Sequence, residues 1–390
     1  MSRMKSVDVL IAGGGIIGYT LANALGQLGL SIMLLDPKRR ETTVRVTPRG
    51  YGVSNRVFTV RPSVRDFFKK IGIWDSIDER RSQAVSKMVV YSASGEPLVF
   101  DAYQAGLEQL ATVVEYEELM RAVLGMMNPQ LIYIVEAGLK AATVKKDRAI
   151  AETTEGLVSC KLLVGADGAN SEVRRSTHID SSYHDYQYTG VVASFSTRRA
   201  HGGVAYQKFV DRGVIAFLPL PDNRTNLVWS LKNELALELN EESIRKRVSA
   251  LFNPLDLHEL ETSIGKFPLG KLTTDAVCKG RVALVGDSAH QFLPLAGQGL
   301  NVGLSDVQKL TKFIASFGRV DPGSNAVVNR YRRACREEID TFGFLTDMIH
   351  KSLMPTQRIT DLFLGASFDA VNKCHSVKRF LVNKASGYDF

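Results

Sequence analysis

A glycine-rich turn close to the N-terminus constrains the fold of this chain more strongly than any other feature. The apolar residues Val7–Ala12 predict a short buried strand. A helix pattern covers Ile17–Leu28, and a second apolar strand, Leu30–Leu35, ends at Asp36. Six residues between the first strand and the helix fit the pattern G-x-G-x-x-G: Gly13, Gly14, Gly15, Ile16, Ile17 and Gly18. This order of elements is typical of a dinucleotide-binding unit.

Each part of the turn has a physical task in binding a dinucleotide. Gly13 permits the tight turn, Gly15 lets the backbone approach a pyrophosphate, and Gly18 lets the helix pack closely on the strand. The free N–H groups at the helix N-terminus attract the phosphate charge. Asp36 stands where a carboxylate can accept hydrogen bonds from a ribose. The turn by itself fits FAD and NAD equally.

A second glycine turn follows a predicted strand at Cys160–Val164. It runs from Gly165 to Ser171 and presents the carboxylate of Asp167 immediately before a helix start with Arg174. One interpretation is a contact between this carboxylate and the cofactor. The other is an ordinary loop between a strand and a helix.

A third segment adds chemistry that suits a flavin. The strand Arg281–Val285 leads to Asp287, whose carboxylate can bond sugar hydroxyls, and a glycine-rich stretch, Pro294–Asn301, opens a helix. Backbone amides at that point can stabilise the negative charge that a reduced flavin carries at N1 and the C2 carbonyl. His290 lies in the same segment, and we favour a local hydrogen-bonding or packing role for it over a general base.

The three segments resemble the motifs of the class A FAD-dependent aromatic hydroxylases, which have the p-hydroxybenzoate hydroxylase-like fold. Motif order and spacing agree over most of the chain. The chain is most similar to the ubiquinone-biosynthesis hydroxylase group. Segments that resemble this group in sequence are Gly286–Val307, Phe217–Pro221 with Val228–Ser230, and the tail around Lys378–Leu381 and Ala385–Gly387.

The resemblance implies roles for particular residues. Asp36 would bind the adenosine ribose, Asp287 the pyrophosphate–ribitol region, and Asp167 would lie near the FAD. Arg56 would be a further cofactor contact, with Arg49 as a competing arginine. The other implied cofactor-binding residues are Gly13, Gly14, Gly15, Ile16, Ile17, Gly18, Pro294, Gly297, Gly299, Leu300 and Asn301. No single catalytic residue is assigned, and the candidates for the flavin face are Pro294, Gly297 and Gln298.

At two places the residues differ from those usual in the family. Phe58 and Thr59 follow Arg56 where small, apolar residues are usual. Tyr116 and Glu117 begin a helix that usually carries Asn, Arg or Gln toward the cofactor.

The predicted fold is α/β, with a Rossmann-type FAD-binding domain and a second, smaller α+β substrate domain. The FAD-binding domain is expected to be discontinuous, over residues 1–75, 100–178 and 272–340. The substrate domain would comprise 76–99 and 179–271, because strand patterns such as Val204–Phe209 and Thr225–Ser230 recur there. Residues 341–390 would form a C-terminal helical extension.

Composition bears on metal binding, nucleic-acid binding and the location of the protein. The cysteines are widely spaced and the histidines do not cluster with them, so we expect no metal site and a reducing compartment. A net charge of +8 without a recognisable module argues against nucleic-acid binding. The chain carries no apparent targeting signal, so we expect a cytoplasmic protein. The basic, apolar stretch Ser376–Lys384 is either a helix that contacts a membrane surface or a biosynthetic complex, or an ordinary helix that caps the domain.

The resemblance implies a monooxygenase that hydroxylates an aromatic or quinone-type ring with O2, through a flavin C4a-hydroperoxide, in ubiquinone biosynthesis. The substrate would be a small ring compound with or without an isoprenoid tail. NAD(P)H or another donor would supply electrons transiently, because no second G-x-G-x-x-G occurs. Two alternatives stay open: an FAD-dependent reductase of isoprenoid double bonds, and a flavin-binding accessory protein of a biosynthetic complex.

Overall fold

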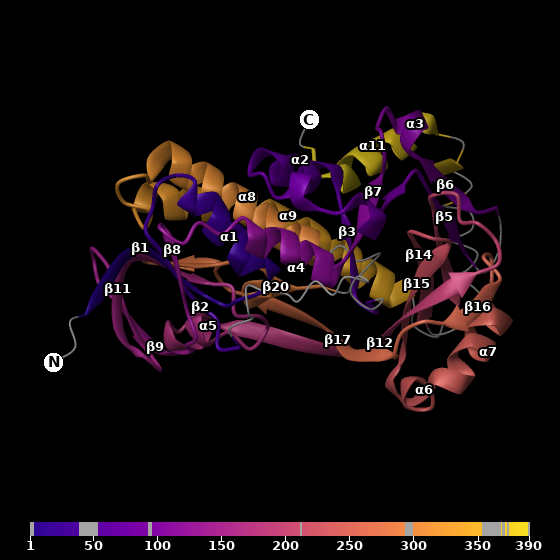
Figure 1. Ribbon diagram of the computed structural model, residues 1–390, viewed down its shortest axis with the longest axis horizontal. Helices are drawn as coiled ribbons and strands as arrows, with labels where there is room; N and C mark the ends of the chain where they lie inside the picture. The colour runs from indigo at the N-terminus through magenta and orange to yellow at the C-terminus, as the bar shows by residue number, and fades with distance from the viewer. Residues whose placement is uncertain are drawn as a thin grey trace.

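Two sheets of different construction lie at opposite ends of the computed structural model, and long strands run between them (Figure 1). The structure describes residues 4–38, 54–92, 96–210, 213–292, 299–352, 368, 371–372 and 374–388. For residues 342, 344–352 and 375 it describes the backbone alone. The candidates Arg49, Pro294, Gly297 and Gln298 therefore lie outside the described residues.

The first sheet has a parallel centre in the order β18-β19-β11-β1-β2-β8, with β10 paired to β11 and β9 to β10. Strands of such a sheet are covered on both faces and need apolar side chains throughout. Accordingly every residue of Ile32–Leu35 is buried. The strands are β1 (Lys5–Ala12), β2 (Ile32–Leu35), β8 (Ile132–Val135), β9 (Leu139–Val144), β10 (Ala149–Thr153), β11 (Gly156–Gly165), β18 (Cys278–Lys279) and β19 (Val282–Leu284).

Helices cover this sheet and complete its apolar core. Helix α1 (Ile16–Gly26) connects β1 to β2, and it packs between α4 (Tyr116–Gly125) and α8 (Gly299–Phe317). Helix α9 (Asn325–Ser352) lies along α8 (Figure 1). The element order β1–α1–β2 agrees with the βαβ unit expected from the glycine turn.

The second sheet is mostly antiparallel, in the order β20-β17-β12-β15-β14-β13-β5-β6, with β16 paired to β12 and a parallel contact between β13 and β5. Its far face packs on α6 (Asn233–Leu237) and α7 (Glu241–Leu251) and forms a separate apolar core. The strands are β5 (Lys87–Tyr91), β6 (Leu98–Asp101), β12 (Ser181–Thr197), β13 (Val204–Val210), β14 (Gly213–Leu220), β15 (Arg224–Lys232), β16 (Leu257–Leu260), β17 (Gly265–Thr274) and β20 (His290–Gln291).

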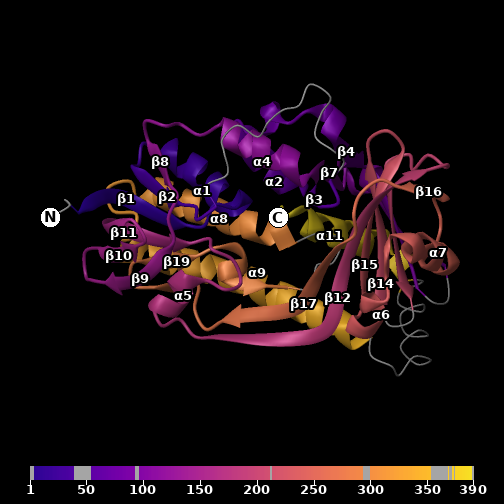
Figure 2. The ribbon, with the colours of Figure 1, turned by 60° about the horizontal axis from the view of Figure 1, so that its bottom comes forward.

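Strands β12 and β17 run from the second sheet back toward the first (Figure 2). Their pairing shifts register between Asp185 and Tyr188, where Gln187 has a φ of 60°. At the near end, β20 pairs with β17 directly after the turn that carries Asp287. The third sequence segment is thus held between the two sheets.

A small sheet in the order β3-β7-β4 lies beside the second sheet. It comprises β3 (Val57–Val60), β4 (Ser82–Val85) and β7 (Ala111–Glu115). The remaining helical segments are α2 (Pro62–Lys70), η1 (Trp74–Ser76), η2 (Glu79–Arg81), α3 (Ala102–Ala105), α5 (Glu172–Ser176), η3 (Gly286–Ser288) and α11 (His375–Ser386). Among the described residues, no helix is long and apolar enough to cross a membrane. The expected domain boundaries stay a prediction. Strand β5 does pair with β13, and β6 with β5, so both belong to the second sheet.

Candidate cofactor and substrate site

The N-terminal glycine turn packs directly against the second glycine turn. Gly13 has a φ of 120°, and a Cβ there would lie 2.1 Å from the carbonyl oxygen of Ala166. A Cβ on Gly18 would lie 2.0 Å from the carbonyl oxygen of Gly13. Both positions therefore exclude any larger residue. Gly15 differs, because no atom lies within 4 Å of the position of its Cβ.

The N-terminus of α1 consequently faces open space. Gly15 is the N-cap residue, and no side chain caps the helix. The first-turn N–H groups are thus available to an anionic ligand. Ile16 is buried in the core, whereas Ile17 lies against Gly286 and Gly303. Ile17 therefore brings the N-terminal turn into contact with the third segment.

Asp36 lies beneath the glycine turn. Its carboxylate is buried, and a Cβ on Gly14 would lie 2.2 Å from Asp36 Oδ2. The Tyr19 hydroxyl donates to Oδ2 at 2.8 Å, and the backbone N–H of Lys38 donates to Oδ1 at 3.1 Å. Gly14 is thus required for the approach of Asp36.

Asp167 caps α5 with one carboxylate oxygen. The backbone N–H groups of Glu172 and Val173 donate to Oδ2 at 2.7 and 3.1 Å. The other oxygen, Oδ1, is buried and has no hydrogen-bond partner among the described residues. A buried acceptor of this kind costs free energy unless a donor reaches it. Asp167 therefore both begins the helix and leaves one oxygen for a ligand.

The second and third segments are tied together by hydrogen bonds. The Arg174 guanidinium donates to the carbonyl oxygen of Ser288 at 2.8 Å, and the Ser288 hydroxyl donates to the carbonyl oxygen of Gly165 at 2.6 Å. Asp287 is exposed to solvent, and neighbouring protein atoms crowd its carboxylate. This crowding raises the pKa of Asp287, although the positive charges of His290 and Arg56 each lower it.

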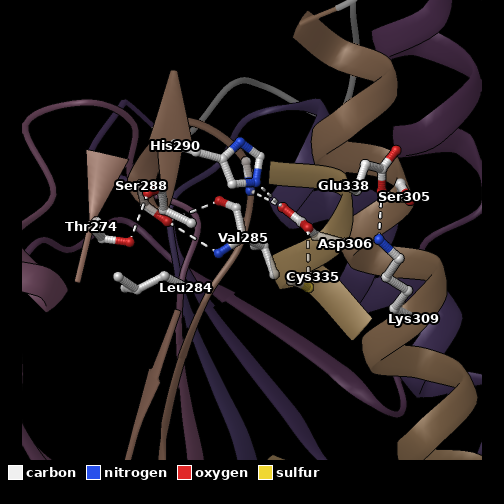
Figure 3. Close-up of polar contacts among 12 residues, drawn as sticks. Thr274, Leu284, Val285, Ser288, His290, Ser305, Asp306, Lys309, Cys335 and Glu338 are labelled. Carbon is white, nitrogen blue, oxygen red and sulfur yellow. Dashed lines mark hydrogen bonds and ion pairs between the residues drawn. The ribbon is translucent and has the colours of Figure 1, made fainter. Parts of the chain in front are cut away.

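His290 forms a buried pair with Asp306 of α8 (Figure 3). Its Nε2 lies 2.8 Å from Asp306 Oδ2, the oxygen that also accepts the backbone N–H of Gly286 at 2.9 Å. Cys335 Sγ donates to the other oxygen at 3.5 Å. Burial lowers the pKa of His290, but the charge and hydrogen bond of Asp306, together with the charges of Asp287 and Glu338, outweigh burial and raise it. His290 thus has the local hydrogen-bonding role expected from the sequence.

Arg56 lies beside the third segment, between two aromatic rings. Its guanidinium carbon is 4.6 Å from the ring centroid of Tyr116 and 5.2 Å from that of Phe58. Such cation–π contacts hold the guanidinium in place. Phe58 and Tyr116, which both differ from the residues usual in the family, therefore position Arg56. Glu117 Oε2 is buried without a hydrogen-bond partner in the described chain.

The first turn of α8 is anchored to β3 and α2. Gly299 and Leu300 begin the helix, and Asn301 is buried. The Asn301 amide donates to the carbonyl oxygen of Thr59 at 2.7 Å, and its Oδ1 accepts the backbone N–H of Arg61 at 3.0 Å. Sequence reasoning placed Asn301 at the flavin ring but missed this anchoring role.

A cavity of about 240 Å³ lies between this anchor and the second sheet. On the sheet side, Met88 is the cross-strand partner of both Phe100 and Ala205, and all three side chains line the cavity. The lining residues are Thr59, Arg61, Val85, Met88, Phe100, Leu110, Ala111, Ala205, Tyr206, Ala216, Leu218, Asn301, Leu381, Val382 and Ala385. Most of these side chains are apolar, as is usual for a pocket that binds a small organic ligand.

The structure also shows site residues that the sequence did not indicate. Glu115, the residue before Tyr116, is buried and pairs with Arg81 at 3.1 Å and Arg224 at 3.4 Å. Burial raises the pKa of Glu115, although both arginines lower it. The Asn226 amide donates to the carbonyl oxygen of Asn55 at 3.1 Å. These contacts fix the small sheet and the residues before Arg56 against the second sheet, and no local sequence signal predicts them.

The α11 wall of the cavity was also missed. The sequence does indicate an inward face for this helix, because Leu381, Val382 and Ala385 have the spacing of one helix face.

The fold and the site define a dinucleotide-binding α/β protein with an apolar cavity beside its cofactor turns. The chain matches the family described as FAD binding domain over residues 6–340, and it belongs to this family. FAD is therefore its cofactor.

The chain is also similar to proteins named as ubiquinone hydroxylases and monooxygenases. The ubiquinone hydroxylase UbiL of Rhodospirillum rubrum is 30% identical, over 99% of this chain and 91% of the relative. The mitochondrial ubiquinone biosynthesis monooxygenase COQ6 of Caenorhabditis elegans is 28% identical, over 98% of this chain and 96% of the relative. The crystal structure of P. aeruginosa PqsL in complex with 2-aminobenzoylacetate superposes with a TM-score of 0.77 at 23% identity, over 92% of this chain and all of that chain, which shows a shared fold. The resemblance to the FAD-dependent monooxygenases that the motifs indicated is confirmed.

Proposed function

We propose that the protein hydroxylates an aromatic or quinone-type ring of a ubiquinone precursor, with FAD at the three turns and the ring in the apolar cavity. The observation that carries this proposal is the position of the cavity. It lies against Asn301 in the first turn of α8 and against Arg61 at the start of α2, and the second sheet bounds its other side. The relatives named for ubiquinone biosynthesis support the choice of substrate.

The residues at the turns fit the pyrophosphate and sugar parts of FAD. The open space at Gly15 would admit the pyrophosphate to the uncapped N-terminus of α1. The unpartnered Oδ1 of Asp167 would accept a hydroxyl from the cofactor. Asp287 and Arg56 would flank the ribitol and pyrophosphate, and Asp36 the adenosine ribose. The first turn of α8, from Gly299 to Asn301, would approach the ring.

FAD, when bound, would supply two electrons taken from NAD(P)H or another donor to activate O2, so that one oxygen atom enters an electron-rich ring and the other leaves as water. The chain's own contribution is to position the ring and exclude water. Met88, Phe100 and Leu218 present apolar surface to the ring, and this surface leaves bulk water no hydrogen-bond partner. The Asn301 amide is already engaged with Thr59 and Arg61, so it holds the wall rather than the substrate.

The test is hydroxylation under ¹⁸O2 by the FAD-loaded protein with NADH or NADPH and a phenol that carries a short isoprenoid tail. We expect one labelled oxygen atom in the product. NAD(P)H oxidation that consumes no oxygen and saturates a double bond would instead identify a reductase. A protein that binds FAD but turns over no ring substrate would point to an accessory role.

A variant pair locates the ring. Leu218→Trp fills part of the cavity and should abolish product formation while the visible spectrum of bound FAD is retained. Leu237→Trp is the matched control, because Leu237 lies on α6 and is 82% exposed. Equal activity of the two variants would place the substrate elsewhere.

The C-terminal region completes the proposal. Helix α11 carries basic and apolar residues on its surface, and it would be the part of the chain that contacts a membrane or a biosynthetic complex. The protein would then act in the cytoplasm, beside the membrane that holds its substrate.

A further inference from the structure

The cavity reaches solvent beside α11. Leu381, Val382 and Ala385 line the cavity from this helix. Val382 is buried, whereas Leu381 is 40% exposed and Ala385 is exposed as well. These two are the most exposed of the residues that line the cavity, all of which the structure describes. The C-terminal helix is therefore the rim of the entrance.

The outer face of this rim is apolar. Val377, Phe380 and Leu381 recur at helical spacing and are 39%, 61% and 40% exposed. Helix α3 packs beside α11 (Figure 1), and its Tyr103 is 90% exposed. We call Tyr103, Val377, Phe380 and Leu381 the entrance patch. Exposed apolar side chains gathered in this way mark an interaction surface.

Positive charge surrounds the entrance patch. Helix α11 contains Lys378, Arg379 and Lys384 and no acidic residue. In the part of the chain that the structure describes, none of these three side chains forms an ion pair. The nearby carboxylates are already engaged, since Glu108 pairs with Arg65 at 2.5 Å and Asp66 accepts the Tyr388 hydroxyl at 2.6 Å.

The C-terminal end of α11 fixes the orientation of this face. Gly387 has a φ of 78°, and a Cβ there would lie 2.3 Å from Ser63 Oγ and 2.5 Å from Arg61 Nε. Ser386 is buried, and Tyr388 bonds to α2 through Asp66. Arg61 itself lines the cavity. The helix is thus seated on α2, with Val382 buried at the cavity and with Arg379, Phe380 and Lys384 exposed to solvent.

We propose that the entrance patch and its basic residues dock on an anionic lipid surface, so that a ring substrate with an apolar tail enters the cavity from the membrane. The nature of the ring rests on the function proposed above, but the docking does not. Apolar side chains enter the headgroup region while Lys and Arg pair with anionic headgroups. Exposed apolar side chains mixed with basic side chains that form no ion pair are the combination that binds an anionic lipid surface.

The first experiment measures sedimentation of the FAD-loaded, full-length protein with vesicles of phosphatidylcholine, alone or mixed with phosphatidylglycerol. Each basic residue near an anionic surface increases partitioning about fivefold, so Arg379→Gln/Lys384→Gln should reduce it roughly 25-fold. Lys145→Gln/Lys146→Gln is the matched control, because it removes the same charge from the exposed turn between β9 and β10. The control should bind like the unaltered protein.

A second variant tests the apolar part. Phe380→Ser keeps every charge and should also weaken binding to the mixed vesicles. If the unaltered protein does not bind mixed vesicles, or if the control pair weakens binding as much as Arg379→Gln/Lys384→Gln, the lipid proposal is overturned. Binding that survives in all variants would overturn it as well.

A kinetic arm separates this proposal from the proposed function. With a long-tailed phenol embedded in mixed vesicles, Arg379→Gln/Lys384→Gln should raise KM and leave kcat unchanged. With a short-tailed phenol in solution, both constants should match those of the unaltered protein. If no phenol is hydroxylated but vesicle binding still depends on α11, the proposed function fails and the docking surface stands. An equal loss with both phenols would show that the variant damages the site, and would contradict a docking role.

Discussion

Replacing Asp306 by Asn tests how the third segment is held in place. The Asp306 carboxylate accepts the backbone N–H of Gly286 and pairs with His290, and both side chains of the pair are 2% exposed. Asparagine keeps one acceptor oxygen but presents an NH2 group where the carboxylate had its second. The imidazole then loses its counter-charge inside the protein, and one of the neighbouring donors loses its partner.

The magnitude follows from the burial of the pair. Removing one partner of a buried ion pair costs about 3–5 kcal/mol. His290 can escape part of this cost by releasing its proton, so we expect the lower end, a decrease of about 3 kcal/mol in the free energy of unfolding at neutral pH. Because Asp306 also holds the amide of Gly286, next to Asp287, FAD affinity should fall about tenfold, which corresponds to roughly 1.4 kcal/mol.

The assay is urea unfolding followed by circular dichroism, together with FAD titration by fluorescence. The control is Glu238→Gln, which removes the carboxylate of an exposed pair with Arg247 at 2.9 Å. Such a pair contributes less than about 1 kcal/mol. If Asp306→Asn unfolds at the same urea concentration as this control and binds FAD normally, the assigned role of Asp306 is wrong.

Three further predictions concern the glycine turn, the pH dependence and the thiols. Gly18→Ala should lower the free energy of unfolding by about 3 kcal/mol in urea titrations, because the alanine Cβ would meet a backbone oxygen. Gly15→Ala should unfold like the unaltered protein but bind FAD at least about tenfold more weakly. The reverse pattern would contradict the roles assigned to these two glycines. The raised pKa of His290 means that the folded protein holds the imidazole proton to higher pH than the unfolded chain does. The free energy of unfolding should therefore be greatest below the ordinary pKa of histidine and should fall as pH rises from that value through the raised pKa. Urea unfolding over this pH range that showed an increase instead would refute the pairing with Asp306. A thiol reagent should modify only Cys374 in the native protein, since the other cysteines are buried and burial raises the pKa of Cys160 to about 12; mass mapping of a second modified cysteine before unfolding would disagree.

The cofactor turns were predictable because their signals are local. The strand before Gly13 and the helix after it were located within two residues of their positions in β1 and α1. Glycine at these positions is required by close backbone contacts within the same short unit. The same reasoning places Asp167 between a strand end and a helix start, where the structure has it, and its contact with the cofactor stays a prediction.

Long-range contacts were not predictable in this way. The partner of His290 is Asp306, and the partners of Asn301 are at β3 and α2, about 240 residues away in the chain. The sequence pattern predicts a strand over Thr189–Phe195, whereas β12 runs from Ser181 to Thr197. The register shift near Gln187 interrupts the alternation of apolar and polar residues and hides the first half of this strand. Tyr116 differs from the residue usual in the family, but its ring lies against Arg56. Its role can therefore be understood only when the position of Arg56 is known.

The central claim is that one FAD binds across the three turns, with its ring toward the apolar cavity. A crystal structure of the protein with FAD tests this most directly. We predict density for the pyrophosphate at the N-terminus of α1 beside Gly15, and for the ring at the first turn of α8, facing the cavity wall formed by Met88 and Leu218. Density for FAD at any other place, or a ring that points away from the cavity, would contradict it.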